Sequence, residues 1–293
     1  MRTRTPLLSP VFLVAVAAPS ARAQTPPAAA WDSVAQILKA PASATGGYYR
    51  YGLPRRDVTL KVGDVTVSPA LALGGWAGFS GASNDATVMG DLVLLASEVK
   101  PVLAELARQR LDVTAVHNHL AGEEPQLTYV HFHGRGGATE LATRLDLVLA
   151  RTATPRPVAA QTPAPPTIDT ALVFGTLGHS GTARGNVAQV GFVLVPGAVT
   201  LHGRALVPAM AYGSPVNIQM VDGTRAVATG DFAVEGAKVS GMLAALAAHG
   251  IAATAVHTHL IGESPHLYYM HFWADGPLAE VLAGLRAALD AAR

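Results

Sequence analysis

The 293-residue chain is 50% hydrophobic and only 14% charged, and it contains no cysteine. This composition excludes global disorder, disulfides, cysteine-ligated zinc, iron–sulfur clusters and a thiol nucleophile. Basic and acidic residues nearly balance, and the chain becomes slightly acidic once Arg2, Arg4 and Arg22 near the N-terminus are set aside. This balance argues against a general nucleic-acid or anionic-membrane binder.

Residues 1–23 have the pattern of a secretory signal peptide. Two arginines precede an apolar stretch at 7–18, and Ala21-Arg22-Ala23 has the small-x-small form that a signal peptidase needs. We therefore expect a mature chain that starts at Gln24, with a Pro/Ala spacer over 24–30, exported to the bacterial periplasm or beyond the cell. The apolar stretch is too short to span a bilayer, and no longer one follows, so no transmembrane segment is expected.

Hydrophobic periodicity and turn residues predict mixed helices and strands after the spacer. In chain order the pattern predicts a helix at 31–40, strands at 58–62 and 65–68 around a Gly63-Asp64 turn, a strand at 91–95, a helix at 98–110 capped by Ser97, a strand at 113–119, a turn at 122–125, a strand at 127–133 and a helix at 139–151. The cluster Arg55-Arg56-Asp57 would suit an anionic ligand, but a solvated charge cluster is the favoured interpretation.

The second half of the chain repeats the first. Residues 114–133 (TAVHNHLAGEEPQLTYVHFH) and 254–273 (TAVHTHLIGESPHLYYMHFW) share 13 of 20 positions without a gap, and Gly90-Asp91 recurs as Gly230-Asp231. A Pro-rich linker at 153–166 separates repeat domain 1 (31–152) from repeat domain 2 (167–293). The fold class expected is therefore α+β, with two tandem copies of one helix/hairpin domain packed as a pseudo-twofold pair.

Histidines are the candidate site residues of both copies. His117 and His119 share a strand face, because side chains two residues apart point the same way, and the short turn that follows returns His131 beside them. Copy two repeats the set as His257, His259 and His271. Each copy also carries a glutamate in the connecting turn, Glu123 in copy one and Glu263 in copy two.

Three histidines and one carboxylate suit a divalent metal such as zinc, manganese or iron, with one position open for water or substrate. The six histidines are the expected ligands, and the glutamates are candidates for a ligand or a general base. Two alternatives remain: a hydrogen-bonded His/Glu site without metal, and purely structural histidines. The role of His133 stays open because Trp273 replaces it in copy two.

The run H-N-H-L-x-G-E-x-P-x-L-x-Y-x-H-F, with Gly-Asp-Leu-Val and Glu98-Val99-Lys100-Pro101-Val102 upstream, resembles the LppY/LpqO family. That family comprises exported bacterial proteins with a domain of unknown function, often in two copies. The resemblance implies an envelope or secreted location but no known reaction. Some relatives are lipoproteins, from which this cysteine-free chain departs.

Two functions follow from these patterns. The first is an exported protein with a duplicated His/Glu site that binds metal and supports metal-assisted hydrolysis of a small-molecule ligand. The second is a non-catalytic envelope module for binding or interaction, in which the histidines are hydrogen-bonded and structural. Neither the substrate nor the oligomeric state follows from the sequence.

Overall fold

The computed structural model describes residues 29–158 and 164–293. The predicted signal peptide and nearly all of the Pro/Ala spacer lie outside these residues, as does part of the predicted linker. Within the described residues, no helix has both the length and the apolar character needed to cross a membrane.

The first half of the chain alternates strands with four helices. Its elements are α1 (Ala29–Leu38), β1 (Ala42–Thr45), β2 (Tyr48–Pro54), β3 (Leu60–Val62), β4 (Val65–Val67), α2 (Pro69–Ala72), β5 (Gly74–Ala82), β6 (Asp85–Leu95), α3 (Ala96–Arg108), β7 (Asp112–His117), β8 (Glu123–Glu124), β9 (Leu127–Gly136) and α4 (Ala138–Leu149).

The second half repeats this order element by element. Its elements are α5 (Thr170–Leu177), β10 (Gly181–Arg184), β11 (Val187–Phe192), β12 (Thr200–Leu201), β13 (Arg204–Ala205), α6 (Pro208–Ala211), β14 (Ser214–Met220), β15 (Arg225–Glu235), α7 (Gly236–Ala248), β16 (Ala252–His257), β17 (Glu263–Ser264), β18 (Leu267–Pro277) and α8 (Leu278–Ala291).

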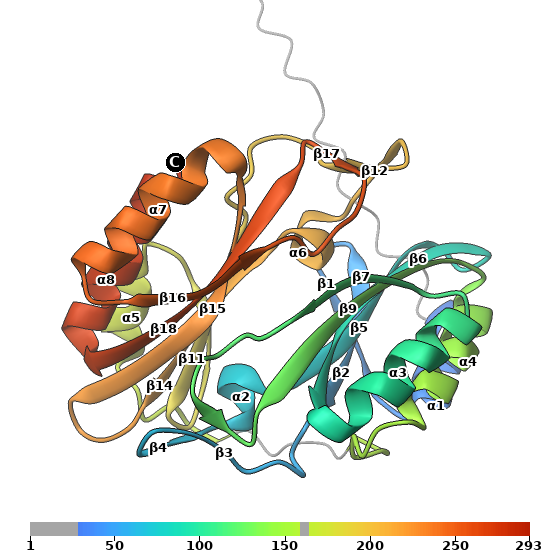
Figure 1. Cartoon of the computed structure of the whole chain (residues 1–293), viewed down its shortest axis with the longest axis horizontal. Coiled ribbons are helices and arrows are strands. Elements are labelled where there is room, and N and C mark those ends of the chain that lie inside the picture. The colour runs from blue at the N-terminus through green and yellow to red at the C-terminus, as the bar shows by residue number, and fades with distance from the viewer. Residues whose placement is uncertain (1–28, 159–163) are drawn as a thin grey trace, which may run out of the picture.

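Each half forms one six-stranded antiparallel sheet. The strand orders are β1-β2-β5-β6-β9-β7 and β10-β11-β14-β15-β18-β16, so the two sheets have the same topology. The long helices cover the outer face of each sheet, and the inner faces turn toward each other (Figure 1). The molecule is thus the expected α+β pair of equivalent domains, arranged in helix–sheet–sheet–helix layers.

Short elements from each half reach across to the other sheet. Helix α2 packs against β14 and β15, while Met210 of α6 joins a buried cluster with Tyr48 and Met89 of the first half. Gln219 accepts a hydrogen bond from the Ser68 backbone N–H at 2.7 Å and donates one to the Thr66 carbonyl at 2.8 Å. These buried polar contacts fix the relative position of the two inner faces.

The sequence predicted the helices and the strands around the histidines well, with two differences. The strand expected at 91–95 is the end of a longer strand, β6. Helix α3 begins at Ala96, so Ser97 lies inside it, and the Glu98 carboxylate accepts the Leu95 backbone N–H at 2.8 Å in place of a serine cap. The Gly63-Asp64 hairpin is present between β3 and β4.

The expectation of a solvated charge cluster at 55–57 is wrong for Arg55. Its side chain is fully buried and donates to the Val93 carbonyl at 2.8 Å, to Glu98 at 2.5 Å and to Asp57 at 2.9 Å. Burial of a guanidinium requires such compensation by carboxylates, because an isolated charge is costly to remove from water. Arg55 is therefore an internal link between β2 and the start of α3.

Candidate histidine centre between the two repeats

The register of the central strands brings the histidines of each half to the inner face of its sheet. In the first half β7 pairs with β9, so that His117 lies opposite Tyr129 and Ala115 lies opposite His131. Directly opposed residues project to the same side of an antiparallel pair, which places His117 and His131 on one face. The pairing of β16 with β18 repeats this arrangement for His257 and His271.

The two sets of histidines form a single cluster between the repeats. The ring centres of His117 and His257 lie 4.0 Å apart, which places the pseudo-twofold axis between these two equivalent residues. The symmetry-related contacts His119–His271 and His131–His259 have ring centres 3.9 and 3.7 Å apart. The sequence predicted one cluster in each copy, whereas the shortest distances between histidine ring centres join one copy to the other.

The described residues include two groups of side chains that could hold a metal ion. His117, His257, His259 and His271 offer ligand atoms within 4.8 Å of one another, and His119, Asp231 and His271 form a second group with the same limit. Both groups draw on both repeats. Three of these rings are almost fully buried, with His119 9%, His259 8% and His271 1% exposed.

Aspartates also belong to the centre, which the sequence indicated only by the recurring Gly-Asp pair. In β6, Asp91 lies opposite His131, and in β15, Asp231 lies opposite His271. The glycine before each aspartate allows close approach of the neighbouring strand. An added Cβ at Gly90 or Gly230 would lie 2.3 or 2.0 Å from a backbone oxygen of that strand. The pair therefore reflects strand packing as well as the site.

Burial and mutual repulsion keep most of these imidazoles neutral. Burial, reinforced by the nearby His271, lowers the pKa of His117 to about 4, and burial with His117 as the main neighbour lowers the pKa of His257 to about 3. Burial also lowers the pKa values of His119, His131 and His259 well below the usual range. Neutral imidazole is the form that binds a metal.

The two aspartates differ in their electrostatics. Burial and the neighbouring Asp231 raise the pKa of Asp91 to about 8. For Asp231 burial acts in the same direction, but the attraction of His271 outweighs it and lowers the pKa. Conversely, burial opposes the charge on His271, yet the contact with Asp231 raises the pKa of His271 overall. Asp231 therefore holds Nδ1 of His271 in a close contact inside the cluster.

Buried ring nitrogens without hydrogen-bond partners show that the residues fit a cation. Nε2 of His117, His131 and His271 and Nδ1 of His257 are buried and have no hydrogen-bond partner among the described residues. A buried polar atom without a partner costs about 1–3 kcal/mol, which a metal–nitrogen bond would recover. Nitrogen ligands with a carboxylate match the preferences of zinc and related divalent ions.

The two glutamates of the connecting turns lie in β8 and β17, outside both groups of candidate ligands. Oε1 of Glu123 accepts the Leu127 backbone N–H at 3.4 Å, and Oε1 of Glu263 accepts the Leu267 N–H at 2.9 Å. Each carboxylate thereby ties its turn to the start of the following strand. The catalytic role that the sequence assigned to these two residues stays a prediction.

Two equivalent tyrosines contact the histidine cluster. Tyr129 and Tyr269 line the cluster by stacking near His119 and His259, and each hydroxyl donates to a backbone carbonyl, of Ala72 and Ala211 respectively. His133 belongs to neither group of candidate ligands, and its Nδ1 lies 3.5 Å from a carboxylate oxygen of Asp112.

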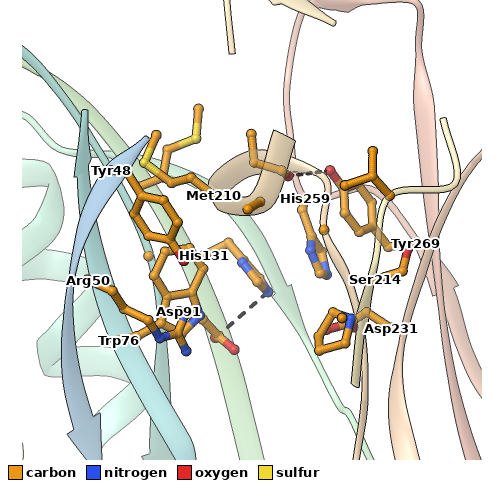
Figure 2. A pocket seen from close by; sticks show the side chains of 18 of the residues that line it. Tyr48, Arg50, Trp76, Asp91, His131, Met210, Ser214, Asp231, His259 and Tyr269 are labelled. Carbon is orange, nitrogen blue, oxygen red and sulfur yellow. Dashed lines mark hydrogen bonds and ion pairs between the residues drawn. The ribbon is translucent and has the colours of Figure 1, made fainter. Parts of the chain in front are cut away.

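A cavity of about 560 Å³ opens beside the cluster, between the two sheets. His131 and Asp91 line one side, and His259, Tyr269 and Asp231 line the other (Figure 2). The far end of the cavity wall is apolar and aromatic, with Tyr48, Trp76 and Met210 (Figure 2). The Arg50 guanidinium stacks on the Trp76 ring at 4.4 Å. The volume of this cavity and its mixed apolar and polar lining are typical of a pocket that binds a small molecule.

Solved structures resemble the chain only distantly. EtuB from Clostridium kluyveri matches with 10% identity and a TM-score of 0.21, over 87% of this chain and 90% of that one. A trimeric bacterial microcompartment shell protein, PduB, matches with 10% identity and a TM-score of 0.22, over 87% and 91% of the two chains. Scores this low support no argument about function. No curated protein matches the chain.

A family model matches both halves, at residues 32–151 and 172–291. The two matches lie on the two sheet-and-helix units that together form the histidine centre. The chain therefore belongs to the family described as Domain of Unknown Function (DUF1259) and carries two tandem copies of its domain.

Proposed function

We propose that the protein binds one divalent metal ion in the cluster shared by its two repeats. The observation that carries this proposal is the set of buried imidazole nitrogens, contributed by both repeats, that face one another without hydrogen-bond partners. Zinc is the best match to a nitrogen-rich set with one carboxylate, and manganese or iron(II) is the next.

The surroundings of His271 support a ligand role for its Nε2 atom. Nδ1 of His271 hydrogen-bonds to the Gly230 carbonyl at 3.1 Å and pairs with Asp231, which leaves the buried Nε2 directed away from these partners. A carboxylate or carbonyl on the second ring nitrogen is the usual way in which a protein orients a metal-binding histidine.

The cavity beside the cluster supports a small-molecule ligand for the same centre. A divalent ion held there would supply Lewis-acid polarisation, which makes metal-assisted hydrolysis the reaction class that we propose. The described residues would contribute orientation and a low-dielectric environment, with Arg50 placed to attract an anionic group.

Hydrogen-bonded structural histidines are the second candidate. Two contacts favour it: Nε2 of His257 lies 2.8 Å from Nε2 of His259, and Nδ1 of His117 lies 3.0 Å from the Asn118 carbonyl. If the histidines are structural, their hydrogen bonds would hold the two repeats together without catalysing a reaction, and the protein would act as a binding or interaction module.

Native mass spectrometry of untagged protein titrated with zinc separates the two candidates. We expect one zinc ion per chain, bound tightly enough to survive desalting, because both groups of candidate ligands share His271 and cannot fill independently. Two ions per chain would support separate sites in the two repeats. Failure to bind zinc, manganese or iron(II) would favour the structural function.

We also propose that the protein is exported, which the resemblance to LppY/LpqO proteins supports. Export in a bacterial host should remove residues 1–23 and leave Gln24 at the N-terminus, because Ala21-Arg22-Ala23 fits the signal peptidase. Intact-mass measurement of the periplasmic or culture-medium fraction checks this result. A secreted product that retains Met1 would contradict the proposed cleavage.

A further inference from the structure

A second cavity, of about 540 Å³, is lined by residues of both halves and by none of the candidate metal ligands. Its first-half wall comes from β5, β6, β9 and the start of β7. Its second-half wall comes from the β12–β13 hairpin and the residues that follow it. Its lining contains three arginines, Arg110, Arg135 and Arg204, and two histidines, His133 and His202.

An ion triad lies at this cavity. Arg135 binds Asp85 through Nε at 2.9 Å, and Arg204 from the other half binds the second oxygen of the same carboxylate. Two guanidinium groups therefore share one carboxylate, which leaves an excess positive charge. Among the described residues that line the cavity, Asp112 is the one acidic residue, and its carboxylate lies 3.5 Å from Nδ1 of His133.

The pseudo-equivalent place on the opposite side of the molecule carries the inverse triad. Strand registers make Arg225 the counterpart of Asp85 and Asp275 the counterpart of Arg135. Arg225 binds Asp275 and Asp64, each at 2.7 Å, and Asp64 belongs to the hairpin that corresponds to β12–β13. Both triads join the two halves although their net charges are opposite, so contact between the repeats alone does not explain the positive charge.

Arg110 gives the strongest sign that the positive charge serves a ligand. It follows α3 with a φ of 55°, a left-handed backbone that favours glycine, and its counterpart after α7 is Gly250 with a φ of 69°. Arg110 is exposed, and its guanidinium makes no ion pair within residues 29–158 and 164–293. A non-glycine residue in this conformation costs stability, and here no ion pair within the described residues offsets that cost.

We propose that this cavity binds a phosphate group of a small soluble molecule, between Arg110, Arg135 and Arg204. Guanidinium groups are the side chains best suited to bind the oxygens of a phosphate, through paired N–H donors. His133 and His202 add donors to the same wall, which gives a function to the histidine that the metal centre does not use.

The test is isothermal titration calorimetry of the full mature chain with inorganic pyrophosphate, at an ionic strength of about 0.15 M, with citrate as a carboxylate probe. We expect one pyrophosphate per chain and weaker binding of citrate. Arg110→Gly should weaken pyrophosphate binding by about tenfold or more, since it removes charge-assisted hydrogen bonds. Its unfolding temperature should be unchanged or higher, because glycine suits the left-handed backbone, so misfolding would not explain the loss.

Two further variants separate the proposal from its alternatives. Arg204→Ala and Asp64→Ala each remove the outer member of one triad, but only Arg204→Ala should lose pyrophosphate affinity. His257→Ala should keep it, which distinguishes this cavity from capture of pyrophosphate by a metal at the histidine centre. No heat of binding with the unmodified protein, tighter binding of citrate, or an equal loss in Arg204→Ala and Asp64→Ala would overturn the proposal.

Discussion

Replacing His117 alone with alanine is expected to lower the zinc affinity of the whole protein by about 100-fold or more, and replacing His257 alone should do the same. Loss of a residue that only orients a metal-binding side chain lowers metal affinity by about 10–100-fold. Loss of a metal-binding side chain itself should therefore lower zinc affinity by at least about 100-fold. The two rings lie 4.0 Å apart across the pseudo-twofold axis, so each alanine removes a member of the same set. Competition with a chromophoric zinc chelator measures both affinities.

His266→Ala is the matched control for these variants. His266 lies in the same segment of copy two, but its side chain is half-exposed and pairs with Glu263 outside the candidate ligand groups. Its loss should leave zinc affinity within about twofold, as surface substitutions away from a site usually have small effects. If His117→Ala and His257→Ala each removed one of two independent ions, the shared centre would be wrong.

Arg55→Met is expected to lower the free energy of unfolding by about 3–5 kcal/mol. The substitution leaves Glu98 buried at 7% exposure without its cationic partner, and breaking a buried ion pair on one side has this cost. Urea denaturation followed by circular dichroism measures the change. An equal slope of unfolding free energy against urea concentration in both proteins would show that their unfolded states are comparable.

Two further variants identify the origin of that loss. Arg56→Met changes the exposed neighbouring residue and should shift stability by about 0.5 kcal/mol or less. The double variant Arg55→Met with Glu98→Leu removes both charges and should recover part of the stability, because an apolar pair of similar volume can replace a buried ion pair. A double variant no more stable than Arg55→Met alone would assign the loss to packing.

The histidine-bearing strands could be predicted because their alternation is strong and their turn is short. Other strands of the same sheets could not be predicted in this way. Strand β5 contains GGWAGFSGA, whose glycines are typical of a loop. Gly75 is nevertheless required within the sheet, because an added Cβ would lie 2.9 Å from the Leu53 carbonyl oxygen of β2. The residue pattern within a strand describes that strand alone, whereas the need for a glycine depends on how closely the backbone of the neighbouring strand approaches it.

The sequence could predict which histidines share a face within one sheet, but it could not predict the contacts between the two sheets. Strand parity places His117 and His131 on one face of one sheet, which sequence spacing reveals. The contact of His131 with His259 depends on how two sheets pack, and no spacing within one repeat encodes it. The aspartates were undervalued because Asp91 lies 40 residues before His131 in the chain, although the two are directly opposed in the sheet.

A cluster on the pseudo-twofold axis has a consequence for the ancestry of the chain. A polypeptide with one copy of this domain would carry only half of the centre and could assemble it solely as a homodimer, at a protein concentration above the dissociation constant of the dimer. Joining two copies in tandem replaces that requirement with a fixed effective concentration of the second half. It also frees the two copies to diverge everywhere off the axis, as the opposite triads of Asp85 and Arg225 already have.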